Sequence, residues 1–432
     1  MITILDWNNL DEAQRQSALT RAIGSGDDVI ERMKIIVQAV REKGNEAVAA
    51  YAKQFDSYSG PLEPISQADI QKAIDSLPKT TRKAMDIAID NLARFHEAQR
   101  PSPVTIETMR GVKCELQWRP IEKVGLYVPG GVAPLFSAVF MLALPAKIAG
   151  CSTRVLCTPP QKDGRINSET LAAAGLCGAT EVYAFGGPWS IAAMAYGTET
   201  VSKVDKILGP GNSYVTATKM IISQDPRGAA IDGPAGPSEV MVIADDGANP
   251  AWVAADLLAQ AEHGRDSQAM LVTPSRKLGE QVNAELQRQR ASLPRNDFIK
   301  SSLSISSILI VKDLDQACEI VSRYAPEHLI LQGGPTATWP TELVPRITQA
   351  GAIFVGDYSP ETAGDYASGA NHVLPTYGLA RAYSGLNLLS FMRSMSVQTL
   401  SQEGLLALAP ALIAMAEAEE LDAHAQAVKI RI

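Results

Sequence analysis

The stretch Gly125-Leu126-Tyr127-Val128-Pro129-Gly130-Gly131 decides the fold, because a short apolar run ends in glycines and an apolar segment from Leu135 to Ile148 follows. Such a run predicts a buried strand, the glycines predict a tight turn, and the longer segment predicts a helix. The same succession recurs at Thr153–Leu156 with Glu169–Leu176, at Glu181–Phe185 with Ser190–Tyr196, and at Lys206–Leu208 with a helix through Lys219. This alternation predicts βαβ units and a parallel sheet covered on both faces.

A second series of apolar runs follows further along the chain, at Glu239–Ile243, Gln268–Val272, Ser307–Val311, His328–Leu331 and Ala352–Val355. We therefore expect an α/β protein with two Rossmann-like parallel sheets. Ligands of such sheets lie beyond the carboxyl ends of the strands. The turns expected to face ligands are Gly130-Gly131, Gly186-Gly187 and Gly209-Pro210-Gly211-Asn212.

Both ends of the chain have a helical pattern. Apolar residues recur three and four apart from Asp28 to Tyr51 and from Ile70 to Phe95, and the region after about Ala380 shows no alternation of strand and helix. The expected division is an N-terminal arm (1–22), a first Rossmann-like domain with a helical N-terminal part (23–126 plus 239–378), a second Rossmann-like domain (127–238) and a helical tail that contacts a partner subunit (379–432).

Composition excludes several classes of protein. The 432 residues are too many for one compact core, and a net charge of −8 without a dense Lys/Arg run argues against nucleic acid as a partner. The longest apolar run, Pro134–Ala146, is shorter than the roughly 20 residues of a membrane span. No signal peptide is expected, and five scattered cysteines without CxxC spacing indicate reduced thiols in a cytoplasmic protein, with no thiolate zinc site.

Gln260 and His263 are the first candidates for chemistry. Asn249 and Pro250 predict the start of a helix and Gly264 predicts its C-terminal cap. Residues three apart share one face of a helix, so an amide oxygen and an imidazole would converge on one metal ion. The alternative is a histidine that interacts with the C-terminus of its own helix.

Glu327 and His328 are the second candidates. Pro326 ends the preceding helix, which places an acid and an imidazole side by side at the junction with a strand. These side chains are the ones most often used for proton transfer near neutral pH. The alternative is an exposed glutamate beside a half-buried histidine.

Two further histidines follow. The region 356–372 is expected to be a long loop at a strand's carboxyl end, and it contains Asp365 and His372. Glu419 and His424 are expected in one C-terminal helix, where five residues correspond to roughly 140° and the two side chains diverge. Either region could be only solvated charge. The fifth histidine, His96, has no assigned role.

The order of these motifs resembles the histidinol dehydrogenase family over nearly the whole chain. The residues that carry the resemblance are Gly125–Gly131, Gly209–Asn212, Pro234-Ala235-Gly236-Pro237-Ser238-Glu239, Gln260-Ala261-Glu262-His263-Gly264, Ala325–His328 and Gly364-Asp365-Tyr366-Ala367-Ser368-Gly369. The resemblance implies a homodimer that oxidises L-histidinol to L-histidine in two NAD-dependent steps, through an enzyme-held aldehyde.

The resemblance also implies roles for individual residues. The zinc ligands would be Gln260, His263, Asp365 and His424, the last from the neighbouring subunit. Glu327 and His328 would transfer protons: His328 would take the hydroxyl proton and Glu327 would activate water. The substrate would contact the zinc ligands, His328, Ser238, His372 and Glu419, and NAD would contact Tyr127 and Asn212. Nitrogen and oxygen donors suit zinc.

Two adjacent positions depart from the family pattern. The family usually has alanine and an NAD-contacting glutamine where this chain has Pro188 and Trp189. An indole could stack on a ring of NAD, but it lacks a carboxamide's acceptor. The alternatives are a related dehydrogenase for another small polar alcohol, a zinc hydrolase that uses Glu327 without a nucleotide, and a binding protein without catalysis.

Overall fold

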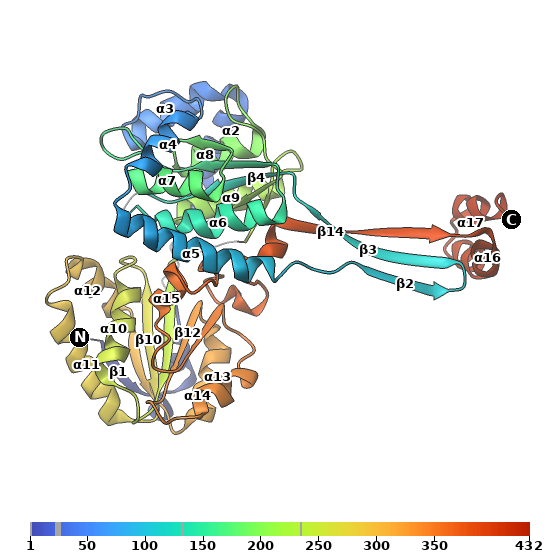
Figure 1. Cartoon of the computed structure of the whole chain (residues 1–432). Coiled ribbons are helices and arrows are strands. Elements are labelled where there is room, and N and C mark those ends of the chain that lie inside the picture. Colours follow the sequence, from blue (N-terminus) through green and yellow to red (C-terminus); the bar gives the residue numbers. More distant parts are fainter. Residues whose placement is uncertain (1, 22–26, 131–133, 234–235) are drawn as a thin grey trace.

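The computed structural model describes residues 2–21, 27–130, 134–233 and 236–432 (Figure 1). Its largest sheet has six parallel strands in the order β1-β11-β10-β9-β12-β13. Their bounds are Thr3–Asp6 (β1), Glu239–Ala244 (β9), Gln268–Thr273 (β10), Ser307–Ile310 (β11), His328–Gln332 (β12) and Ala352–Val355 (β13).

Helices cover both faces of this sheet. Along β9 the side chains of Val240 and Val242 join the core on one face, and those of Met241 and Ile243 join the core on the other, as the two-residue period of a strand requires. The first face is covered by α10 (Pro250–Ala261), α11 (Arg276–Arg290) and α12 (Asn296–Ser304), and the second mainly by α13 (Leu314–Tyr324) and α14 (Trp339–Leu343). The uninterrupted apolar runs are thus explained by burial on both sides.

The second sheet has five parallel strands in the order β6-β5-β4-β7-β8. The strands are β4 (Lys123–Tyr127), β5 (Thr153–Cys157), β6 (Glu181–Tyr183), β7 (Lys206–Leu208) and β8 (Ala230–Ile231), and the helices are α6 (Phe136–Ala149), α7 (Ser168–Cys177), α8 (Gly187–Tyr196) and α9 (Ser213–Gln224). Two parallel sheets flanked by helices confirm the expected fold class.

The helices of the N-terminal region pack on the five-stranded sheet and not on the six-stranded one. They are α2 (Asp27–Lys43), α3 (Asn45–Asp56), α4 (Gln67–Asp75) and α5 (Lys79–Glu97), and Met33, Val48 and Leu92 share a core with Val124 and Leu126 of β4. Grouping residues 23–126 with 239–378 was therefore wrong for these helices. An amphipathic pattern shows that a helix has an apolar face, but not which sheet that face covers.

The N-terminal arm is also part of a folded unit, because β1 pairs with β11 and α1 (Glu12–Ala18) follows it. Five short stretches complete the first two units: the helix α15 (Glu361–Tyr366) and 3-10 turns at Trp7–Asn9, Val344–Arg346, Leu379–Arg381 and Leu388–Phe391. His96 is buried, with Nδ1 2.9 Å from the carbonyl oxygen of Leu92.

A third, antiparallel sheet forms an arm that projects from the two parallel sheets (Figure 1). Its strands, in spatial order, are β14 (Met392–Leu400), β3 (Val112–Pro120) and β2 (Val104–Met109), and its tip carries α16 (Gln402–Ala418) and α17 (Asp422–Lys429). The expectation of helices alone after Ala380 was wrong. Strand β14 is largely exposed, so it lacks the alternation that marks a half-buried strand.

Two smaller findings concern the predictions about membrane spans and cysteines. Within the described ranges, no helix is both long and apolar enough to cross a membrane. All five cysteines lie in those ranges and are free thiols.

Candidate active site

The residues with candidate chemistry, apart from Glu419 and His424, converge between the two parallel sheets. Ser238 directly precedes β9 and His328 begins β12, so this part of the site lies at the amino ends of the six-stranded sheet. Tyr127 ends β4 and Asn212 follows β7, so the other part lies at the carboxyl ends of the five-stranded sheet. The expectation that ligands lie beyond the carboxyl ends of the strands therefore holds for the five-stranded sheet and not for the six-stranded one.

Helix α10 places Gln260 and His263 at the site. The Asn249 side chain accepts a hydrogen bond from the N–H of Ala251 at 2.9 Å, as an N-cap should. The helix ends at Ala261 with Glu262 as its cap, so the prediction that Gly264 is the cap was wrong. Gln260 is fully buried and His263 lies just beyond the last turn.

A group able to hold a metal ion is formed by His263, Asp365 and Glu361. Their ligand atoms lie within 4.8 Å of one another, and His263 Nε2 is 3.9 Å from Asp365 Oδ2. Asp365 and Glu361 are four apart in α15, so the prediction of a long loop over residues 356–372 was wrong for the part that forms this helix. Glu361 was not among the residues expected at the site, although its i,i+4 spacing from Asp365 after Pro360 was a usable signal.

The buried amide of Gln260 lies beside Glu361 in this group. With its nitrogen toward Glu361, it donates to Glu361 Oε1 at 2.8 Å and to the Glu239 carbonyl at 3.3 Å. With its oxygen toward Glu361, it faces only acceptors. The first orientation therefore satisfies the amide nitrogen by hydrogen bonds alone. The case for a metal rests on the donor types themselves, since imidazole nitrogen, carboxylate oxygen and amide oxygen together fit a divalent cation such as zinc.

Glu327 and His328 are positioned by the backbone of Glu239. The N–H of Glu239 donates to Glu327 Oε2 at 2.8 Å, and His328 Nδ1 lies 3.0 Å from the carbonyl oxygen of Glu239. Since a carbonyl oxygen only accepts, Nδ1 carries the proton and Nε2 is the free base. His328 Nε2 is buried and finds no hydrogen-bond partner in the part of the chain that the structure describes.

The Glu239 side chain is itself clamped by Arg21, from the N-terminal segment. Arg21 donates through Nε at 2.6 Å to Oε1 and through Nη2 at 2.8 Å to Oε2. The N–H of Tyr377 donates to Oε1 at 2.7 Å. The Arg21 guanidinium lies 3.7 Å from the centre of the Tyr324 ring, a cation–π contact. This bidentate pair fixes the residue that holds Glu327 and His328.

Burial sets the charge states of the site. It raises the pKa of Asp365 to about 6, and burial with neighbouring carboxylates raises the pKa of Glu361 and of Glu327 well above the usual range. Burial lowers the pKa of His328 to about 3 and of His372 to about 4. The imidazoles are therefore neutral near pH 7, and the crowded carboxyl groups favour a bound cation.

The remaining predicted substrate residues divide into two groups. His372 approaches His328 closely enough to influence its charge, and Ser238 accepts a backbone hydrogen bond from Gln268 N–H at 3.1 Å through its carbonyl. Glu419 and His424 are exposed at the tip of the arm and are not brought to the site within one chain (Figure 1). They do not share a helix, since α16 ends at Ala418 and α17 begins at Asp422; that prediction was wrong.

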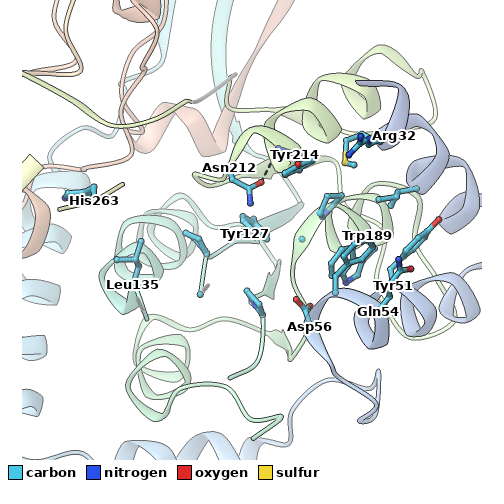
Figure 2. A pocket seen from close by; sticks show the side chains of 18 of the residues that line it. Arg32, Tyr51, Gln54, Asp56, Tyr127, Leu135, Trp189, Asn212, Tyr214 and His263 are labelled. Carbon is cyan, nitrogen blue, oxygen red and sulfur yellow. Dashed lines mark hydrogen bonds between the residues drawn. The ribbon is translucent and has the colours of Figure 1, made fainter. Parts of the chain in front are cut away.

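A cavity of about 970 Å³ extends from this site across the five-stranded sheet. It is lined by the three residues predicted to contact NAD, Tyr127, Trp189 and Asn212, and it reaches His263 (Figure 2). Asn212 caps α9 by accepting from the N–H groups of Tyr214 and Val215, each at 3.1 Å. Three residues of the predicted glycine motifs, Gly131, Pro234 and Ala235, lie outside the described residues.

Comparison with known proteins agrees with this geometry. The sequence model of histidinol dehydrogenase matches residues 19–432. A histidinol dehydrogenase from Vibrio parahaemolyticus is 51% identical over 427 residues, covering 99% of this chain and 97% of that protein. One from Campylobacter jejuni is 50% identical over 430 residues, covering 99% of each. The crystal structure of histidinol dehydrogenase from Elizabethkingia anophelis matches with a TM-score of 0.94 at 41% identity, covering 100% of this chain and 98% of that one. The chain therefore belongs to the histidinol dehydrogenase family.

Proposed function

We propose that this protein oxidises L-histidinol to L-histidine in two NAD-dependent steps, with zinc bound at the substrate site. The observation that carries the proposal is the position of His328, whose free Nε2 lies in a cluster of neutral imidazoles and carboxyl groups. That cluster opens at His263 onto a cavity large enough for a dinucleotide. A base, a metal-type donor set and a nucleotide-sized cavity in one place match an alcohol dehydrogenase.

The residues proposed to hold zinc are Gln260, His263 and Asp365, with His424 of the partner subunit. Zinc supplies orientation when bound, because histidinol offers an amine and an imidazole as further ligands. Ser238, His328 and His372 would line the substrate pocket together with Glu419 of the partner subunit. Glu361 would stay beside Gln260 and fix its amide.

The proton transfers are assigned to Glu327 and His328. In the first step His328 Nε2 accepts the hydroxyl proton while a hydride leaves the same carbon for NAD, which gives an aldehyde and NADH. In the second step Glu327 removes a proton from water as the water adds to the aldehyde. A second hydride then leaves for a second NAD, and the carboxylate forms. The raised pKa of Glu327 suits a carboxylate that must accept a proton.

The position of the arm bears on the oligomeric state of the protein. Within this chain α17, which contains His424, lies at the tip of the arm, away from α10, whose end positions His263, so a site containing both histidines needs a second copy (Figure 1). Exposed apolar side chains run along the arm, among them Ile106, Met415 and Ile430. Burying them against a partner would be favourable. We therefore propose a homodimer with exchanged arms and two shared sites.

The test is purified full-length protein with L-histidinol and NAD, followed by NADH absorbance with and without a zinc chelator. We expect two NADH per histidinol consumed, loss of activity with the chelator and recovery with added zinc. One NADH per alcohol would contradict the second oxidation. Turnover of another small polar alcohol, with none of histidinol, would make the protein a dehydrogenase of different specificity.

A further inference from the structure

The cavity has two chemically different ends, and the proposed function orients the dinucleotide within it. His263 lies at one end, with Trp189, Tyr51 and Asp56 at the other (Figure 2). Hydride transfer requires the nicotinamide beside the substrate carbon, and therefore at the His263 end. The adenosine half must then lie toward Trp189. This step rests on the proposed function; the following ones rest on the residues at that far end.

Three aromatic rings are stacked at the far end. Trp189 and Phe55 have ring centres 5.5 Å apart with planes 17° from parallel, and Tyr51 lies 6.2 Å from Trp189 at 24°. Trp189 is only 4% exposed, whereas Phe55 is 57% exposed although it lines the cavity. A Cβ on Gly187 would lie 2.7 Å from the indole ring, so the backbone also packs against Trp189.

This arrangement changes the role expected for Trp189. Its ring is enclosed by Phe55, Tyr51 and Gly187, so little of it is free to contact a ligand directly. Phe55 instead presents an open ring to the cavity and is supported from behind by the indole. A large exposed aromatic ring held in a stack is the arrangement on which nucleic-acid-binding proteins stack bases.

Asp56 follows Phe55 at the end of α3 and lines the same end of the cavity. Burial raises the pKa of its carboxyl group, and the nearby backbone of Gly186 offsets part of this rise. Its Oδ2 is buried and has no hydrogen-bond partner among the residues of the described ranges. Dinucleotide-binding proteins use a carboxylate of this kind to accept hydrogen bonds from the hydroxyl groups of the adenosine ribose. The same negative charge would repel a 2′-phosphate.

We propose that Phe55, supported by Trp189, stacks on the adenine of NAD, and that Asp56 accepts hydrogen bonds from the adenosine ribose and excludes NADP. Phe55 and Asp56 are then specificity-determining residues for the cofactor. They perform this role on a helix of the N-terminal region, outside the strand–turn–helix motifs that usually bind dinucleotides. The indole in place of a glutamine at position 189 becomes a structural support for Phe55.

The stacking role is tested by calorimetric binding of ADP-ribose and of nicotinamide mononucleotide, without histidinol. Phe55→Ala should weaken ADP-ribose binding about tenfold or more and leave the mononucleotide unchanged. Phe95→Ala is the matched control, since Phe95 is 52% exposed on α5 and does not line the cavity. Phe55→Tyr should retain binding, which separates loss of the ring from misfolding. Equal ADP-ribose affinity in Phe55→Ala and the wild type would overturn the stacking role.

The role of Asp56 is tested by comparing the Kd values for NAD and NADP. The wild type should prefer NAD by at least tenfold, and Asp56→Asn should reduce that preference mainly by tightening NADP. Asp90→Asn, at an exposed carboxylate outside the cavity, should change neither value. An unchanged ratio of the NADP and NAD Kd values in Asp56→Asn would overturn the assignment. Equal binding of NAD and NADP by the wild type would also overturn it. That result is expected if Arg32, which lines the same cavity, pairs with the 2′-phosphate. If these affinities behave as predicted while histidinol is not oxidised, the proposed substrate is wrong and the nucleotide site stands.

Discussion

Replacing Arg21 by alanine should destabilise the protein although Arg21 lies outside the proposed pocket. Glu239 is 2% exposed, and its carboxylate depends on two hydrogen bonds from Arg21, at 2.6 and 2.8 Å, and one from the N–H of Tyr377. Without Arg21 a buried charge would lose its paired cation and two of its hydrogen-bond donors. Breaking a buried ion pair from one side costs about 3–5 kcal/mol, and we expect a loss of that size.

The assay is urea unfolding of Arg21→Ala, beside Arg82→Ala as a control. Arg82 pairs with Asp86 at 2.9 Å, but both side chains are exposed, so its loss should cost under about 1 kcal/mol. Adding Glu239→Gln to Arg21→Ala should recover part of the stability, because it removes the unpaired charge. The clamp also positions the residue that holds Glu327 and His328, so NADH formation should fall in Arg21→Ala at temperatures where the variant is folded.

Two results would refute this reasoning. A loss below about 1 kcal/mol in Arg21→Ala would show that the ion pair behaves like an exposed one. A double variant less stable than Arg21→Ala would show that the cost came from the contacts of Arg21 with Tyr324 and not from the charge of Glu239.

Three further outcomes are expected. His328→Asn should lower kcat by roughly 10²- to 10⁴-fold in steady-state assays, with zinc content unchanged by mass spectrometry, since a base is lost and not a ligand. His263→Ala and His424→Ala should each be inactive, but subunits mixed after denaturation should recover about a quarter of wild-type activity, because half the dimers then hold one intact site; no recovery would contradict exchanged arms. Burial raises the pKa of Asp256 from 3.8 to about 7, so the folded state binds the extra proton and wild-type stability should fall between pH 4 and 7. Asp256→Asn should remove that fall, worth up to about 4 kcal/mol at 1.36 kcal/mol per pKa unit, as measured by unfolding at several pH values.

Local sequence patterns predicted the parallel sheets well, because their strands are buried on both faces and appear as uninterrupted apolar runs. The strand Glu239–Ala244 was expected almost to the residue. The arm was not predicted: β14 pairs with β3, whose register runs from Met392 opposite Pro120 to Leu400 opposite Val112. A strand that is mostly exposed and pairs with a segment so distant in sequence leaves no local periodicity to detect.

The candidate site shows the same limit. Gln260 with His263, and Glu327 with His328, were identifiable as pairs from their spacing. Glu361 was missed because a glutamate after a proline is common on surfaces, and only the packing of α15 against α10 buries it. The amino-acid sequence alone could not show that Arg21 contacts Glu239, since the two residues are 218 positions apart. Contacts of this kind are set by tertiary packing, which propensity and spacing do not encode.

The six-stranded sheet meets the site with the amino ends of its strands, and the five-stranded sheet meets it with the carboxyl ends. This arrangement bears on how one site could carry out two oxidations. The proposed substrate residues, Ser238, His263, His328 and Asp365, all come from the six-stranded unit, whereas Tyr127 and Asn212 come from the five-stranded unit. Two hydrides need two molecules of NAD, so the first NADH must leave while the aldehyde stays. Because the two ligands are held by different sheets, the cofactor end of the cavity can exchange its occupant without breaking the contacts proposed to hold the aldehyde. Weak nucleotide binding would then favour turnover, since each cycle requires two departures of NADH and only one of histidine.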